Sequence, residues 1–382
     1  MDKSNVKYSN IWLDGYRSFF LISIIFFLVV MALWAVQFTA SYPRDTLLMI
    51  STHQHAMLMI WGMLGAIFGF ILTAFPKNTG GLRIPPAAAL KILSSLYLVV
   101  SLLSLLAVYY FPTWHQGVTI AKSLFFLTIS LYLIWIYAVS TTEGIMRVQE
   151  ISVLVAMLIG TTITLGDLRY FNLPHTMIVQ LFLYNFFLYL IFSILYRVLP
   201  FFLSKRVVGY NIQRGPLFLP VLFVILLLRT YSSRYGQLGV VQACDISLLY
   251  WIGRELVRWK VWLGFKNTMI TFHLLSAIWI LVGLTVSIFG STILPLPAIS
   301  HIFFMGGFIL LIYTISIRVG QGHASLPLVV NWLDWTTLLL FHLVFAIRLF
   351  TDSYSVAGFA LVTFFILWAV RVVPLFVVKV EQ

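Results

Sequence analysis

Residues 18–39, SFFLISIIFFLVVMALWAVQFT, carry no charged side chain. A helix that crosses a bilayer needs about 20 consecutive, mostly apolar residues, so this segment predicts one. Eleven further segments of the same kind follow along the chain. They are residues 55–75, 87–110, 119–139, 150–168, 174–197, 214–230, 236–253, 268–289, 295–317, 330–350 and 354–378.

The composition of the whole chain agrees with this reading. Of its 382 residues, 61% are hydrophobic and only 9% are charged, whereas a soluble domain has about 25% charged residues. A water-soluble enzyme is therefore excluded. Twelve spans use about 240 residues, which leaves no room for a separate soluble domain. We predict an all-α integral membrane protein of about twelve helices, with residues 1–382 in a single polytopic membrane domain.

The net charge of +13 would suggest nucleic acid in a soluble protein. In a membrane protein, basic residues collect on the cytoplasmic side, which is a topological signal. If the chain starts inside, eighteen of the 24 basic residues fall on the inner side, and six on the outer. Both termini are predicted to be cytoplasmic, and no nucleic-acid partner is expected. The single cysteine, Cys244, excludes a disulfide framework, an iron–sulfur site and a cysteine-based zinc site.

Several of the eight histidines fall near the outer ends of predicted spans. At 1.5 Å per residue, His301 lies about 9 Å and His342 about 12 Å from the outer ends of their helices. His53 and His55 stand at the outer end of the second span, and His175 follows Pro174 at the outer start of the sixth. Ionisable side chains at these depths are costly and indicate function. Imidazoles suit haem iron or copper.

The spacing of His53 and His55 leaves two geometries open. If the stretch is helical, the two rings are separated by about 200° and serve different faces. If the stretch is extended, they point the same way and chelate one ion together.

Two arginines stand at the predicted inner ends of spans. Arg197 lies in Tyr196-Arg197-Val198-Leu199-Pro200, and Arg318 precedes Gly320-Gln321-Gly322-His323. Each arginine either complements the carbonyl end of its helix or grips an anionic group. The two glycines are expected to allow a tight backbone around His323.

Two further features concern the interior of the predicted bundle. Asp245 falls in the middle of the eighth span; either it pairs with an arginine, or the span boundary is misplaced. Gly62, Gly65 and Gly69 lie near one stripe of the second span, which predicts close helix packing rather than chemistry.

Three segments resemble the NnrS family, in the family's order along the chain. The first is His53-Gln-His55-Ala56 with Gly69-Phe-Ile-Leu-Thr-Ala-Phe-Pro76-Lys-Asn-Thr-Gly80. The second is Arg197-Val-Leu-Pro200-Phe-Phe, and the third runs from His301 to Arg318-Val-Gly-Gln-Gly-His323. With the twelve spans, the resemblance covers most of the chain.

The sequence departs from the family pattern at a few positions. Ala56 stands where the family commonly has glutamate, Ala324-Ser325 replaces Thr-Gly, and Lys77-Asn78-Thr79 lacks a tryptophan. If the glutamate orients a ligand or relays protons, the chain belongs to a divergent branch.

The resemblance implies a haem-containing (b-type) and copper-containing protein of the bacterial inner membrane, with a fold distantly like subunit I of haem–copper oxidases. It implies a role in nitric oxide metabolism and nitrosative stress, with nitric oxide or a similar diatomic ligand as partner. The electron donor is not specified, and neither is catalysis. Depth and motif together indicate His55 and His301 as haem ligands and His53, His175 and His342 as further haem or copper ligands. Arg197, Arg318 and His323 are the other cofactor-binding candidates.

Two other classes remain as alternatives. A haem–copper oxidase or nitric oxide reductase suits the twelve spans but needs an adjacent histidine pair on the seventh, and residues 214–230 contain no histidine. A metal-free transporter would show internal repeats and polar residues at the midplane, for which Gln180, Asn185 and Asp245 are weak candidates.

Overall fold

The computed structural model describes residues 6–8, 15–39, 50–74, 85–168, 173–290, 294–351 and 353–380. The described chain is almost entirely helical, with one pair of three-residue strands. It divides into two compact units, the first made of Met1–Phe125 with Ile312–Gln382 and the second of Phe126–Leu311.

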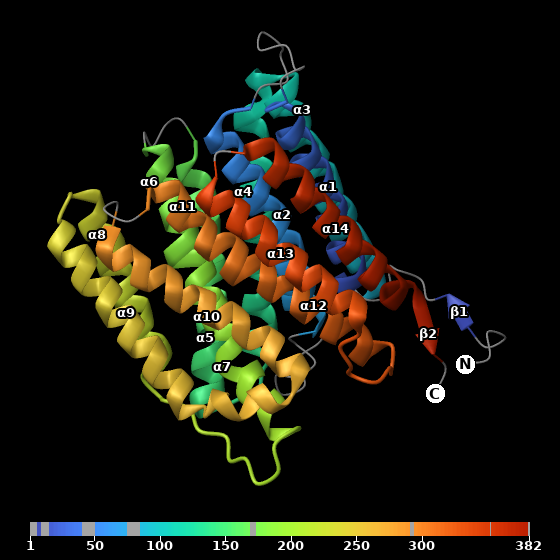
Figure 1. Cartoon of the computed structure of the whole chain (residues 1–382), viewed down its shortest axis with the longest axis vertical. Coiled ribbons are helices and arrows are strands. Elements are labelled where there is room, and N and C mark those ends of the chain that lie inside the picture. The colour runs from blue at the N-terminus through green and yellow to red at the C-terminus, as the bar shows by residue number, and fades with distance from the viewer. Residues whose placement is uncertain are drawn as a thin grey trace. The chain divides into compact units, whose positions relative to one another are not determined.

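The first unit is built around α1 (Gly15–Val36), which packs against α2 (Thr52–Gly69) and α14 (Tyr354–Val377). The rest of this unit is η2 (Phe70–Ala74), α3 (Ala87–Tyr109), η4 (Pro112–Trp114), the start of α4 (His115–Ala138), most of α12 (Leu310–His323) and α13 (Trp332–Phe350). Strand β1 (Val6–Tyr8) pairs antiparallel with β2 (Val378–Val380) and so joins the two terminal segments (Figure 1).

The glycine stripe of α2 is a packing surface, as predicted. A Cβ at Gly65 would lie 2.3 Å from Ser23 Oγ and 2.5 Å from a ring carbon of Tyr97. At Gly69 it would lie 2.9 Å from the Cα of Tyr16. Only glycine permits α1 and α3 to approach α2 this closely.

Helix α3 has an apolar exterior and a partly polar interior. It buries Ser94, Tyr97, Ser101 and Ser104. On its exposed face it carries large aliphatic residues, among them Ile92 (60% exposed) and Leu102 (51% exposed). Buried serines satisfy their hydroxyls locally; Ser101 Oγ donates to the carbonyl of Tyr97 at 2.7 Å. This distribution is favourable against lipid and unfavourable against water.

The second unit begins within α4 and contains α5 (Gly144–Gly166) packed on α7 (Tyr189–Ser204). Helices α8 (Phe218–Arg234) and α9 (Leu238–Arg258) form an antiparallel pair, and α10 (Thr268–Phe289) packs on α9 and on η9 (Ile302–Ile309) (Figure 1). The remaining elements are α6 (His175–Gln180), η6 (Leu181–Leu188), η7 (Val261–Lys266) and α11 (Leu296–His301).

Asp245 pairs with an arginine, which decides between the two readings of the sequence. Asp245 lies in the interior of α9 with no exposed surface. Its carboxylate accepts hydrogen bonds from Nε and Nη2 of Arg229 on α8. Ser287 of α10 donates a further hydrogen bond to Oδ2 at 2.7 Å. The ion pair therefore links three helices of the second unit.

Ten helices in the described part of the chain are long and apolar enough to cross a membrane. They correspond to ten of the twelve predicted segments. The other two, residues 214–230 and 236–253, fall on α8 and α9. Helix α8 has 17 residues, and α9 carries Asp245, Arg254, Glu255 and Arg258. The count of twelve spans and the cytoplasmic position of the termini stay predictions.

Three of the long helices contain π-helical segments, which the sequence analysis did not anticipate. They are η2, η6 and η9. In η9, a Cβ at Gly306 would lie 2.8 Å from the Trp279 ring, and one at Gly307 would lie 2.7 Å from Ile280. The widened helix thus packs its glycines against α10. Such π-segments occur frequently at functional sites.

Candidate haem- and metal-binding residues

The predicted site residues are divided between the two units. His53, His55, Arg318, His323 and His342 belong to the first unit, and His175, His301 and Arg197 to the second. Each is described within its own unit.

The His53–His55 stretch is helical. Ser51 caps α2: its Oγ accepts the N–H of Gln54 at 3.2 Å, while Gln54 Oε1 accepts the N–H of Ser51 at 2.8 Å. The middle residue of His-Gln-His therefore fixes the start of the helix. The two imidazoles consequently diverge, so chelation of one ion by both, the extended alternative, does not occur.

His55 is held by an aromatic neighbour. Its ring stacks on that of Trp34 from α1, with centroids 3.9 Å apart and an interplanar angle of 21°. Trp34 in turn packs edge-on against Phe38. A ring stacked through its face keeps its nitrogens at the edge, so this packing orients His55 without using its ligand atoms. The sequence analysis missed Trp34, although its place at the outer end of the first predicted span was visible.

His301 and His342 share one local geometry. Nδ1 of His301 lies 2.6 Å from the carbonyl oxygen of Pro297, and Nδ1 of His342 lies 2.8 Å from that of Leu338. Because a carbonyl only accepts, Nδ1 must carry the proton, and the neutral ring has its lone pair on Nε2. Metal-ligating histidines are commonly oriented by such a bond to the backbone. His301 also stands directly before η9.

His273 has the same arrangement, with Nδ1 2.6 Å from the carbonyl oxygen of Met269. It is buried in α10 and its ring packs against Phe202. The sequence analysis did not single it out. Its signal was its position five residues into an apolar run.

His175 lies close to a carboxylate that the sequence analysis overlooked. Asp167 follows the end of α5, and His175 is the first residue of α6. A carboxylate oxygen of Asp167 and a ring nitrogen of His175 are within 4.8 Å of one another. One imidazole and one carboxylate suit a first-row transition metal. The signal for Asp167 was its position only eight residues before His175, at the same connection between spans.

Arg197 lies in α7 near the end of the helix. Its Nη1 is buried and has no hydrogen-bond partner among the described residues. Tyr137 OH, in the same unit, is in the same condition. Buried polar atoms of this kind call for a ligand or water. This favours the alternative in which Arg197 binds an anionic group over the one in which it only complements the carbonyl end of its helix.

The Gly-Gln-Gly-His segment differs from the expectation. Helix α12 continues through Gly320 and Gly322 to His323, so the predicted tight backbone around His323 is wrong. Gly320 instead packs closely on α14, since a Cβ there would lie 3.0 Å from Leu375. Arg318 lies half-buried on the same helix. His323 packs against Tyr16, with ring centroids 4.7 Å apart.

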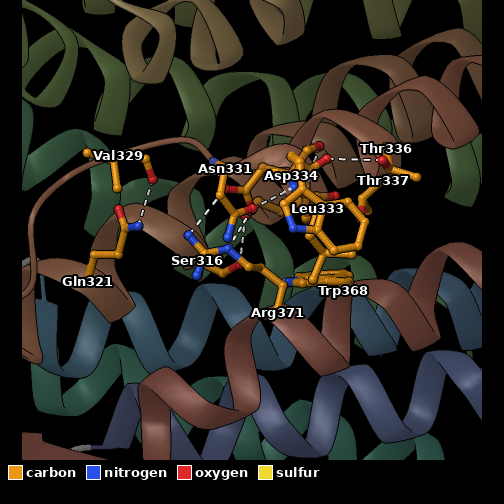
Figure 2. A network of polar contacts seen from close by, with 12 residues as sticks. Ser316, Gln321, Val329, Asn331, Leu333, Asp334, Thr336, Thr337, Trp368 and Arg371 are labelled. Atoms are coloured by element: carbon orange, nitrogen blue, oxygen red, sulfur yellow. Dashed lines mark hydrogen bonds and ion pairs between the residues drawn. The ribbon is translucent and has the colours of Figure 1, made fainter. Parts of the chain in front are cut away.

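Gln321 anchors the loop that follows. Its Nε2 donates to the carbonyl of Val329 at 2.7 Å. Figure 2 shows this bond beside Asp334, which lies between Asn331 and Arg371. Asn331 and Asp334 form a capping box at the start of α13, and Arg371 of α14 binds both carboxylate oxygens of Asp334, at 2.6 and 3.2 Å. The contacts of Asn331, Asp334 and Arg371 are made entirely between protein groups, which indicates a structural role.

The histidines fit the groups that the sequence implies. In His301 and His342 the lone pair of Nε2 can coordinate a metal, and in His55 stacking leaves both ring nitrogens at the edge of the ring. Imidazole nitrogens are common ligands of haem iron and copper. The Pro76–Gly80 part of the motif lies outside the described residues.

Comparison with known proteins identifies the family of the chain. Neither a curated protein nor a solved structure matches it. The family model described as "NnrS protein" matches residues 10–379, nearly the whole length. The chain belongs to the NnrS family.

Proposed function

We propose that this protein is a haem-binding and copper-binding protein of the bacterial inner membrane that binds or turns over nitric oxide. The family match over residues 10–379 carries the proposal. It is supported by the backbone-anchored imidazoles of His301 and His342.

We assign His55 and His301 as haem ligands, and His53, His175 and His342 as further haem or copper ligands. The chain's own groups would orient these ligands: Trp34 through stacking, and the carbonyls of Pro297 and Leu338 through Nδ1. Arg197, Arg318 and His323 would bind an anionic group of a cofactor at the other ends of their helices. Because Arg318 and His323 stand more than about 20 Å along the helix from His301, that group is not part of the haem held by His301. Bound haem iron or copper would supply affinity for a diatomic ligand, which dissolves in the bilayer and arrives from lipid.

The test is the cofactor content of the full chain, purified in detergent from haem-replete and copper-replete cells. We expect a Soret band, a b-type pyridine haemochrome and bound copper. His55→Ala and His301→Ala should each lower the haem content or shift the band. His115→Ala is the matched control, because His115 begins α4 and is not among the assigned ligands.

Two results would overturn parts of this proposal. A wild-type protein without haem and copper would remove the function, and solute uptake into proteoliposomes by that colourless protein would favour a transporter. An unchanged haem content in both histidine variants would remove the ligand assignment.

A further inference from the structure

The second unit has a pocket at the end where α5 begins, α7 ends, α8 begins and α9 ends. Its volume is about 470 Å³, and its lining includes Glu143, Ile145, Met146, Ile212, Arg214 and Arg258. Ligand pockets in proteins span roughly 300–1,000 Å³. Of the helices at this end, α5 and α7 belong to segments long and apolar enough to cross a membrane.

Arg214 is fixed in the pocket wall by the backbone. Its Nε donates to the carbonyl of Tyr196 at 2.7 Å, and its Nη2 donates to that of Arg197 at 3.3 Å. Both acceptors are neutral, so they orient the guanidinium without compensating its charge. Partial burial lowers the pKa of Arg214, which reflects incomplete solvation of that charge. Nη1 makes no bond to any residue that the structure describes.

Arg258 is fixed by a buried carboxylate. Its Nη1 lies 3.3 Å from Oε2 of Glu255. Oε1 of Glu255 also accepts the N–H of Gly215 at 2.7 Å and the Nε1–H of Trp259 at 2.9 Å. Glu255 offsets the charge of Arg258, whose side chain stays 29% exposed in the pocket lining and can still donate hydrogen bonds. A Cβ at Gly215 would lie 2.6 Å from Glu255 Oε2, so a larger residue there would displace the Glu255 carboxylate from its present position.

The lining also carries one negative charge and an apolar side. Glu143 precedes α5, and its side chain makes no capping hydrogen bond there. A carboxylate beside two guanidinium groups disfavours a simple anion but suits a zwitterion. Guanidinium groups bind phosphate, and a carboxylate binds a primary ammonium. Ile145, Met146 and Ile212 provide apolar surface for the start of acyl chains.

We propose that this pocket binds the phosphoethanolamine headgroup of a membrane phospholipid. Arg214 and Arg258 hold the phosphate, and Glu143 accepts hydrogen bonds from the ammonium. Phosphatidylcholine has the same phosphate but no N–H donor, and phosphatidylglycerol has no cation. The pocket therefore distinguishes phosphatidylethanolamine from both.

Native mass spectrometry of the delipidated full chain tests this with the three lipids in matched acyl chains. The wild type should bind phosphatidylethanolamine about tenfold more tightly than the other two, the value of one charge-assisted hydrogen bond. Glu143→Gln should remove this preference, because the amide no longer offers a charged acceptor to the ammonium. Arg258→Gln and the pocket-filling Met146→Trp should weaken binding of all three lipids.

Arg254→Gln is the matched control, because Arg254 lies one turn from Arg258 on α9 over the ring of Trp251, outside the lining. Size-exclusion profiles and melting temperatures identify any variant that misfolds. Each variant that folds then tests the proposal independently of the others. Equal binding of the three lipids to the wild type would overturn the proposal. Displacement of the lipid by millimolar inorganic phosphate would overturn it too, in favour of a soluble phosphate ligand.

Discussion

The indole of Trp34 lies flat against the imidazole of His55, with centroids 3.9 Å apart. Under the proposed function, Trp34 positions a haem ligand. Trp34→Leu should lower haem affinity about 10-fold to 100-fold, the usual effect of losing a ligand's orienting partner, and should shift the reduction potential. Trp34→Phe keeps a stacking face and should restore both properties. If Trp34→Leu lowers the melting temperature but leaves the potential unchanged, Trp34 has only a packing role.

The Arg229–Asp245 pair offers a test of buried electrostatics. Both residues are at most 5% exposed, so Asp245→Ala leaves a buried charge without its partner. We expect a loss of about 3–5 kcal/mol in unfolding free energy, measured as a lower melting temperature in detergent. The double variant Arg229→Leu/Asp245→Leu should recover much of that loss. A single variant as stable as the wild type would contradict this account of the α8–α9–α10 packing.

Gly65 is predicted to be intolerant of even one methyl group. Gly65→Ala forces Ser23 and Tyr97 to move, and overpacking of this kind costs about 1–3 kcal/mol. Gly117→Ala is the matched helical control, since no described atom lies within 4 Å of a Cβ placed there. That substitution should be neutral or stabilising by about 0.5–1 kcal/mol. Equal melting temperatures of the two variants would argue against the glycine stripe as a close-packing surface.

Asp334 combines a helix cap with an ion pair, so its removal should cost more than the loss of either contact. Asp334→Ala leaves Arg371 of α14 without its carboxylate and ends the capping box of α13. Arg371→Lys keeps the charge but cannot bind both oxygens. We therefore expect the melting temperature to fall further for Asp334→Ala than for Arg371→Lys. The reverse order would contradict this account, because Asp334→Ala removes the bidentate contact as well as the cap.

The apolar segments predicted most of the helices because a spanning helix must be apolar over about 20 residues. The same rule explains why α8 and α9 are not among the helices that are long and apolar enough to cross a membrane. Asp245 and Glu255 are buried with partners on other elements, among them Arg229 and Gly215. Composition alone does not reveal such pairs. The helical reading of His53–His55 depends on Gln54, whose capping role follows from its spacing to Ser51.

The other features of the candidate site could not be predicted, because they depend on contacts between segments that are distant in the sequence. The π-segment η9 places Gly306 against Trp279, and no local periodicity indicates that contact. Gly320 appeared to serve the backbone around His323, whereas it serves α14. The proximity of Asp167, just after α5, to His175, at the start of α6, is likewise visible only in the structure. Sequence reasoning identified the histidines, and the structure supplied the groups that orient them.

The most direct test of the central claim is an anaerobic titration of the purified, reduced full chain with nitric oxide, followed through its Soret band. The account predicts a saturable shift of the band in the wild type and in His115→Ala. It predicts a lost or altered shift in His301→Ala or His55→Ala. A wild-type protein whose spectrum does not respond to nitric oxide would contradict the claim.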